Sequence, residues 1–318
     1  MQDFKTTLIP GKSSHEISHS DSILIMGSCF AQEIGKKLIE NKFLLHESPF
    51  GIVYNPMSIW QQLNRIIDCD FYSEANPVFA NDLYHSLDHH GDYSNPSKEE
   101  LIVTINDGLR ITHNVLKKLD YLIISFGSSY YYKYIESNQI VSNCHKIPSS
   151  QFSKVLPDLE TISQNANQVI KRILQFNPSL KIILTISPVR YLRDGFVGNN
   201  RSKAKLISLV EHLEARFESI EYFPSYELLI DDLRDYRYYK DDMLHPSSIA
   251  IEYIWQAFSD SYFSDTTKEI IGEMNLINKF MNHRNTSILE KHVEGRNEKI
   301  KILIKNILEK YPILSNRF

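Results

Sequence analysis

Ser28, Asp242 and His245 have the residue types and the order that nucleophilic catalysis requires. Ser28 follows a short apolar run, and Asp242 precedes His245 by three residues far downstream. A serine becomes a nucleophile when a histidine takes its proton, and a carboxylate holds that histidine in the useful tautomer. Serine after a glycine is also a common helix cap. The order nevertheless predicts a catalytic triad, with a simple cap at Ser28 as the alternative.

The segment at 23–38 moves from a strand pattern through a turn into a helix pattern. Residues 23–26 are branched and apolar, which is typical of a strand buried on both faces of a parallel sheet. Gly27 permits a sharp turn, and apolar residues then recur at helical spacing. Ser28 is therefore expected at the carboxyl end of a strand, beside helix N–H groups that can stabilise an oxyanion.

Strand and helix patterns alternate along most of the chain, as in a parallel α/β sheet. Strands are expected at 23–26, 43–46, 120–129, 181–189 and 220–229. Helices are expected at 29–41, 58–67, 97–118, 151–175, 201–219 and 249–263. Residues 101–107 could instead form a strand. The polar stretch at 70–97 has little periodicity, and a loop of this length is expected to overhang a functional site.

The segment MGSCFAQEIG at 26–35 resembles the motif that gives the GSCFA family its name, and that family is similar to the SGNH/GDSL hydrolases. The other matching segments are SPFGIVYNPMSI (48–59), ISFGSSYYY (124–132), NCHKIP (143–148), TISPVRYLRDGFVGNNRSKA (185–204) and DDMLHPS (241–247). The resemblance implies an SGNH-hydrolase-like, flavodoxin-like three-layer α/β sandwich with a central parallel sheet. We expect this domain over 1–265, followed by a C-terminal helical extension at 266–318.

The resemblance also implies an oxyanion hole. SGNH hydrolases use the N–H of the nucleophile, here Ser28, and that of a glycine after the second strand, which Gly51 matches by order. Gly51 as an ordinary turn glycine is equally compatible with the sequence. The third donor in those enzymes is the asparagine of a Gly-x-Asn-Asp block, where this chain has Gly-Ser-Ser-Tyr at 127–130. Asn143 and Ser129 are the two candidate replacements.

Several polar residues are candidates for substrate contact. Arg190 and Arg193 follow the expected strand at 181–189, and parallel sheets bind ligands beyond the carboxyl ends of their strands. A guanidinium there could clamp a carboxylate, sulfate or phosphate, or pair with Asp194. The complete predicted set is Asn55, His89, His145, Arg190 and Arg193. Tyrosine clusters at 130–134 and 236–239 either line a cleft or pack at an edge of the domain.

The composition is that of an ordinary globular protein, with 318 residues, 42% hydrophobic and 23% charged. A net charge of −4 gives no argument for nucleic acid or membrane partners. No apolar run reaches about 18 residues, and the N-terminus lacks a signal-peptide core, so a cytoplasmic location is expected. The oligomeric state is left open.

Cysteine and histidine spacings predict neither a metal site nor another cofactor. Cys29, Cys69 and Cys144 are too irregularly spaced for a zinc motif or a disulfide framework, and reduced thiols are expected. His85, His89 and His90 in the segment at 70–97 lack a zinc signature.

The favoured hypothesis is a serine esterase that acts, through an acyl-enzyme, on an acyl ester of a sugar or another small polar molecule. An O-acyltransferase using the same triad is the first alternative, because an alcohol can replace water in resolving the acyl-enzyme. A carbohydrate- or anion-binding protein on an inherited hydrolase fold is the second. Cys29 as nucleophile is a weaker alternative, because the triad order favours its neighbour.

Overall fold

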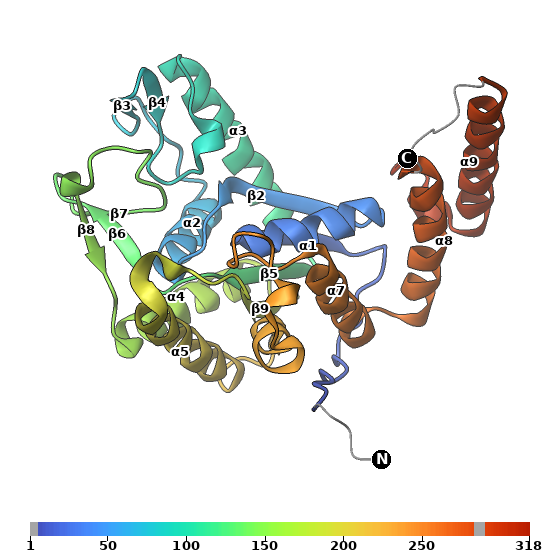
Figure 1. Cartoon of the computed structure of the whole chain (residues 1–318). Coiled ribbons are helices and arrows are strands. Elements are labelled where there is room, and N and C mark those ends of the chain that lie inside the picture. The colour runs from blue at the N-terminus through green and yellow to red at the C-terminus, as the bar shows by residue number, and fades with distance from the viewer. Residues whose placement is uncertain (1–5, 283–289) are drawn as a thin grey trace.

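A five-stranded parallel sheet forms the centre of the protein, whose computed structural model describes residues 6–282 and 290–318 (Figure 1). Its strands are β1 (Ser22–Gly27), β2 (Leu44–Ile52), β5 (Tyr121–Phe126), β9 (Lys181–Ile186) and β10 (Ile220–Phe223). The spatial order is β2-β1-β5-β9-β10, and every neighbouring pair is parallel. Counted within this sheet the order is 2-1-3-4-5, which is the flavodoxin-like arrangement. The predicted fold class is confirmed.

Helices cover both faces of this sheet and complete three layers (Figure 1). One face carries α1 (Cys29–Glu40) and α7 (Ser248–Tyr262), and the other carries α2 (Pro56–Asp68), α3 (Lys98–Leu116), α4 (Leu159–Phe176) and α5 (Gly195–Glu214). In β1, Ile23 and Ile25 pack with α1 and α7, while Leu24 and Met26 pack with the opposite helices. This alternation is the two-residue period of a strand buried on both faces.

Two small antiparallel sheets lie outside the central one (Figure 1). The first pairs β3 (Val78–Ala80) with β4 (Leu83–His85) inside the stretch expected to be a loop, and that stretch also holds the 3₁₀ turn Gly91–Tyr93. The second has the order β7-β6-β8, from β6 (Tyr131–Tyr134), β7 (Gln139–Val141) and β8 (Phe152–Val155), with the 3₁₀ turn Ser149–Gln151 before β8.

Several predicted boundaries are wrong. The strand expected at 220–229 ends at Phe223, and helical turns follow from Ser225. The helix expected from 151 begins at Leu159, because residues 152–155 form β8 and Asp158 caps α4 by accepting from the Thr161 N–H at 2.6 Å. The helix expected from 201 already begins at Gly195, after the 3₁₀ turn Leu192–Asp194. The strand expected at 43–46 continues to Ile52, through a register shift opposite Ile25 and Gly27.

The chain between β10 and α7 carries short helical turns. They are α6 (Ser225–Glu227), a π-helical turn (Leu228–Leu233) and a 3₁₀ turn (Tyr236–Tyr238). The loop that follows contains Asp242 and His245, and its ends are joined by a bridge between Tyr239 and Pro246.

The C-terminal segment is helical, with α8 (Asp265–Asn282), α9 (Glu290–Lys310) and the 3₁₀ turn Pro312–Leu314. These elements share a small apolar cluster that includes Met274 and Ile307. Ile271 of α8 packs into the cluster around α7, and Arg317 donates to the Lys42 carbonyl at 2.8 Å. The segment therefore packs on the sheet domain, while the boundary at 265 stays a prediction.

A search of the described helices finds none with the length and apolar character needed to cross a membrane. The cytoplasmic location stays a prediction.

Candidate active site

Ser28 occupies the turn between β1 and α1, and its side chain is nearly buried. Its Oγ accepts a hydrogen bond from the Phe30 N–H at 3.3 Å and lies 2.9 Å from the Ser125 Oγ. Gly27 allows this close approach to β5, because it has a φ of +130° and a Cβ there would overlap the Ser125 carbonyl. Ser28 is thus a helix cap, and its hydroxyl also sits at the carboxyl end of the sheet.

A cavity of about 220 Å³ opens at the carboxyl ends of β1, β5 and β9, and we call it the Ser28 cavity. Its lining residues are Ser28, Cys29, Tyr54, Gly127, Ser187, Val189, Arg190, Tyr191, Leu192, Arg193, Leu244 and His245. The strand order reverses between β1 and β5, and open α/β sheets bind ligands at such a switch point. The structure therefore brings Ser28 and His245 to one cavity, together with both predicted arginines.

Asp242 holds His245 from one side. Its Oδ2 lies 2.6 Å from the Nδ1 of His245, and its Oδ1 accepts from the backbone N–H groups of Leu244 at 2.8 Å and His245 at 3.0 Å. These backbone and ring hydrogen bonds lower the pKa of Asp242 to about 2. The carboxylate is therefore ionised at neutral pH, and it favours the tautomer of His245 that leaves Nε2 able to accept a proton.

Arg190 fastens the His245 loop to the end of β9. Its backbone N–H donates to the Leu244 carbonyl at 3.0 Å, and its guanidinium lies 5.3 Å from the ring centroid of Tyr239 and 5.4 Å from that of Tyr236. The tyrosine cluster at 236–239 thus packs against this arginine. Arg193 lies further along the same segment and is exposed.

No hydrogen bond joins Ser28 to His245 among the described residues. The Ser28 hydroxyl contacts Ser125 instead. Catalytic hydrogen bonds commonly tighten only when substrate binds, so this arrangement is compatible with a resting triad. Cys29 lines the same cavity, but burial raises the pKa of its thiol and so disfavours the thiolate.

The predicted oxyanion donors lie in different settings. The Ser28 N–H donates to the Ser125 carbonyl at 3.0 Å, so this donor is occupied in the structure. Ser129 is fully buried and turned towards α5, where its N–H and Oγ bond to Ser202. Gly51 has a φ of +71° and shares a second, smaller cavity with Ser28. Asn143 accepts from the His145 N–H through Oδ1, which leaves its Nδ2 without a partner among the described residues.

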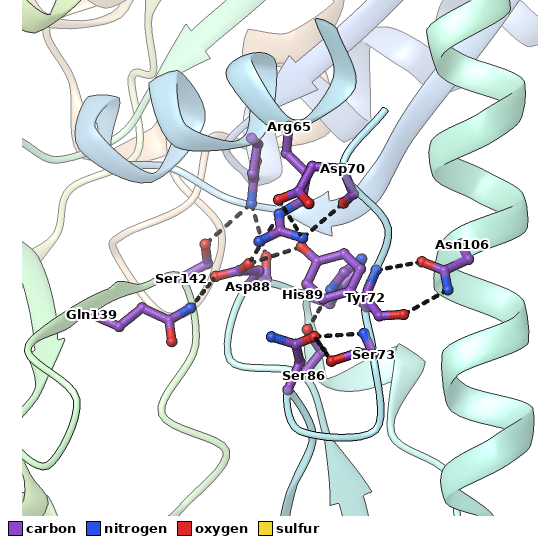
Figure 2. A network of polar contacts seen from close by, with 12 residues as sticks. Arg65, Asp70, Tyr72, Ser73, Ser86, Asp88, His89, Asn106, Gln139 and Ser142 are labelled. Carbon is purple, nitrogen blue, oxygen red and sulfur yellow. Dashed lines mark hydrogen bonds and ion pairs between the residues drawn. The ribbon is translucent and has the colours of Figure 1, made fainter. Parts of the chain in front are cut away.

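Three of the predicted substrate contacts have side chains engaged inside the protein. Asn55 caps α2 by accepting from the Ser58 N–H at 2.8 Å. His89 is buried among aromatic rings, and its Nδ1 lies 2.7 Å from the Ser86 Oγ (Figure 2). His145 is bonded to the Ser86 carbonyl through Nε2 at 2.8 Å. Burial lowers the pKa of His89 to about 3 and that of His145 to about 4, so both are neutral at pH 7.

Lys203 is a buried cation beneath the Ser28 cavity that sequence reasoning missed. Its Nζ donates to the carbonyls of Gly127 at 2.7 Å and Ser187 at 2.6 Å, which follow β5 and β9. Burial lowers the pKa of Lys203 to about 7, and a neutral amine keeps two N–H donors for these two acceptors. Helical periodicity with Leu206 and Val210 places Lys203 on the buried face of α5, and that spacing is the signal in the sequence.

Tyr54 lines both the Ser28 cavity and a larger neighbouring cavity, whereas Tyr191 lines the Ser28 cavity. The hydroxyls of Tyr54 and Tyr191 lie 2.9 Å apart, and burial raises the pKa of Tyr54. The larger cavity, which we call the Asn143 cavity, measures about 690 Å³. Cys29, Tyr54 and Arg193 line both cavities.

No group of three or more His, Cys, Asp or Glu side chains among the described residues is arranged to hold a metal ion. His85 has both ring nitrogens within hydrogen-bond distance of other groups, at 2.7 Å from the Ser94 Oγ and 2.9 Å from the Ala80 carbonyl.

The model of the GSCFA family matches residues 22–258, so this chain belongs to the GSCFA family. No curated protein matches the chain. Among solved structures it is similar to a candidate platelet activating factor from Streptococcus pneumoniae, with 13% identity over 78% of this chain and 85% of that chain and a TM-score of 0.41. A candidate acylhydrolase from Bacteroides fragilis is 11% identical over 83% of this chain and 92% of that chain, with a TM-score of 0.39. A carbohydrate esterase family 3 protein from Talaromyces cellulolyticus is 8% identical over 80% of this chain and 99% of that chain, with a TM-score of 0.35.

Proposed function

We propose that the chain is a serine esterase that uses Ser28, His245 and Asp242 to cleave an acyl ester of a sugar or another small polar molecule. The observation that carries the proposal is the shared Ser28 cavity, in which Ser28 meets a histidine already bonded to a carboxylate. The cavity lies at the switch point of the sheet, where ligands of such folds bind. The resemblance of the GSCFA motif region to SGNH hydrolases supports the same reaction class.

The proposed reaction has two steps. The Ser28 Oγ attacks the ester carbonyl while the Nε2 of His245 takes its proton, and His245 then gives that proton to the departing alcohol. The acyl-enzyme on Ser28 is cleaved by a water that His245 deprotonates, which returns the proton to Ser28 and releases the acid. Asp242 stabilises the imidazolium formed in each step.

The oxyanion donors of this reaction are part of the proposal. Gly51 is favoured because it shares a cavity with Ser28, and Asn143 is favoured because its Nδ2 has no partner among the described residues. The Ser28 N–H joins them only if its bond to the Ser125 carbonyl opens. The Ser129 hydroxyl would have to leave Ser202 to contribute. Loss of one such donor costs roughly 10²–10³ in rate in enzymes where it is known.

Hydrolysis of 4-nitrophenyl acetate by Ser28→Ala tests the proposal. We expect a loss of about 10⁴-fold or more in kcat, because the nucleophile is gone, with a thermal midpoint close to that of the parent. Ser128→Ala is the matched control, because Ser128 is also buried but bonds to Ser202 of α5 and lines neither cavity. Equal activity in the two variants would contradict the proposal.

A further inference from the structure

The Asn143 cavity is three times as large as the Ser28 cavity by the volumes given above, and the two are contiguous through shared walls. The Ser28 cavity is closed by apolar side chains such as Val189, Leu192 and Leu244, which suit a short acyl chain. The neighbouring cavity has polar and cationic groups such as Asn143, Lys146 and Arg193 beside apolar ones such as Ile147 and Phe152. Such mixed walls suit the alcohol portion of a polar ester.

The charge on the walls of the Asn143 cavity is positive. Lys146, Lys154 and Arg193 line it, and none of its lining residues is an aspartate or glutamate. Lys154 is compensated by an ion pair with Asp194. Within the described part of the chain, no carboxylate lies within ion-pair distance of Lys146 or Arg193. Burial and the charge of Arg193 lower the pKa of Lys154.

The turn that presents Lys146 is held in an unfavourable backbone conformation. His145 and Lys146 have φ values of +47° and +58°, in the left-handed region that favours glycine. Asn143 secures the turn by accepting from the His145 N–H at 2.9 Å, and the His145 ring stacks on His85 at 4.5 Å. Backbone strain that the surroundings maintain in this way is typical of ligand-binding sites.

A buried polar network, drawn in Figure 2, reaches Ser142, which is one of the residues that line the cavity. Asp88 accepts from the Tyr72 hydroxyl at 2.8 Å and from Gln139 of β7 at 3.4 Å, and the Arg65 guanidinium lies 3.9 Å from it. Ser142, at the rim of the cavity, donates its N–H to the Leu87 carbonyl at 2.8 Å. The network joins the segment at 70–95 to β7 through hydrogen bonds of Asp88, and these bonds hold this part of the cavity wall in place.

We propose that the Asn143 cavity binds the alcohol portion of the substrate and that this portion carries an anionic group, a carboxylate or a phosphate, which Arg193 and Lys146 bind. The inference rests on the proposed esterase function, which supplies the ester bond beside Ser28. A guanidinium offers paired N–H donors to either anion, and a lysine adds a point charge. Arg193 and Tyr54 line both cavities, so a molecule bound there reaches from one cavity to the other.

Calorimetric titration of the Ser28→Ala variant tests the inference without any need for catalysis. The probes are glucuronic acid, glucose 6-phosphate and glucose, which present a carboxylate, a phosphate and no charge on a similar ring. We expect at least one anionic probe to bind about tenfold or more tightly than glucose, because hydrogen bonds to charged groups are worth that factor. The anion that binds more tightly identifies the group.

In the Ser28→Ala background, a second substitution, Arg193→Gln or Lys146→Gln, should abolish the preference for the anionic probe over glucose. Arg201→Gln in the same background should preserve that preference. Arg201 is an exposed arginine on α5 that lines neither cavity, so its loss removes the same charge elsewhere. Three outcomes would overturn the inference. They are glucose binding as tightly as both anions, no binding of either anion, and an anion preference that survives both Arg193→Gln and Lys146→Gln. An anion preference in a protein whose Ser28 proves unreactive would overturn the esterase function and leave the anion site standing.

Discussion

Ser28 and His245 line one cavity, but the chain holds them in different ways. Ser28 is 4% exposed at a strand-helix junction, where its Oγ and N–H both bond to Ser125 of the neighbouring strand. The His245 side chain is 38% exposed on a loop, held by Asp242 and by the link from Arg190 to Leu244. The proposed nucleophile thus belongs to the folded core, and the proposed base lies on an exposed loop at its surface.

Because Ser28 is buried and His245 is exposed, substitutions around the two residues are expected to have different effects on stability and on activity. Groups beneath Ser28 hold buried strand ends together, so their removal is expected to destabilise the fold. Groups around His245 orient an exposed ring, so their removal is expected to reduce the reaction rate at unchanged stability.

The largest effect is expected for His245→Ala. The ring takes and returns the proton in both proposed steps, so kcat with 4-nitrophenyl acetate should fall about 10⁴-fold or more. The thermal midpoint should stay within experimental error of the parent, because the residue is on an exposed loop. A drop of many degrees would show that His245 is structural and would remove the contrast with Ser28.

Lys203→Met should give the largest loss of stability. The substitution leaves the carbonyls of Gly127 and Ser187 without their donor, and each unsatisfied buried acceptor costs about 1–3 kcal/mol. Urea denaturation at pH 10 measures this loss, because the cost of deprotonating Lys203 on folding is then small. Lys205→Met, on the same helix but only partly buried, is the matched control and should change the free energy of unfolding little.

The pH dependence of stability distinguishes Lys203 from an ordinary buried side chain. Its pKa is about 7 in the folded state, against 10.5 for an unperturbed lysine. Between these values the unfolded chain binds the extra proton, so the free energy of unfolding of the parent should rise with pH, by up to about 1.4 kcal/mol per unit. Lys203→Met should lack this rise, and an identical slope in both proteins would show that Lys203 does not titrate there.

A smaller effect is expected for Arg190→Gln. The backbone link to Leu244 remains, but the contacts of the guanidinium with Tyr236 and Tyr239 are lost, and each is worth about 0.5–1 kcal/mol at an exposed site. We expect kcat/KM to fall about tenfold with little change in stability. Arg201→Gln should leave both unchanged, and equal effects of the two substitutions would contradict a positioning role for Arg190.

The sequence predicted the elements that are strongly periodic. The apolar runs of β1, β5 and β9 and the helix after Ser28 were located because burial on both faces leaves an uninterrupted pattern. The short strands β6 and β8 were missed, since four residues of mixed polarity carry no clear period. Ser28 and His245 line one cavity, as expected from the order of triad residues along the chain and not from local pattern. The triad itself stays a prediction.

The surroundings of the predicted substrate contacts were harder to foresee than the shared position of Ser28 and His245. His89, His145 and Asn55 are polar residues in plausible segments, but only the tertiary structure shows that their side chains are engaged with Ser86 and with a helix end. Lys203 was overlooked for the opposite reason, because lysine is rarely buried. The partners of His145 and Lys203 lie on distant segments, and a single sequence does not show which segments meet. His89 and Asn55 bond to residues only three positions away, so for them the sequence does not show which of several nearby groups the side chain takes.

The most direct test of the central claim is labelling of the purified protein with a fluorophosphonate probe, followed by intact mass and peptide mapping. An activated serine is required for this reaction, whereas the identity of the substrate is not. We predict one adduct, located on Ser28 and greatly diminished in His245→Ala. An adduct on another residue, or none on the folded protein, would contradict the claim that Ser28 and His245 form a nucleophile and its base.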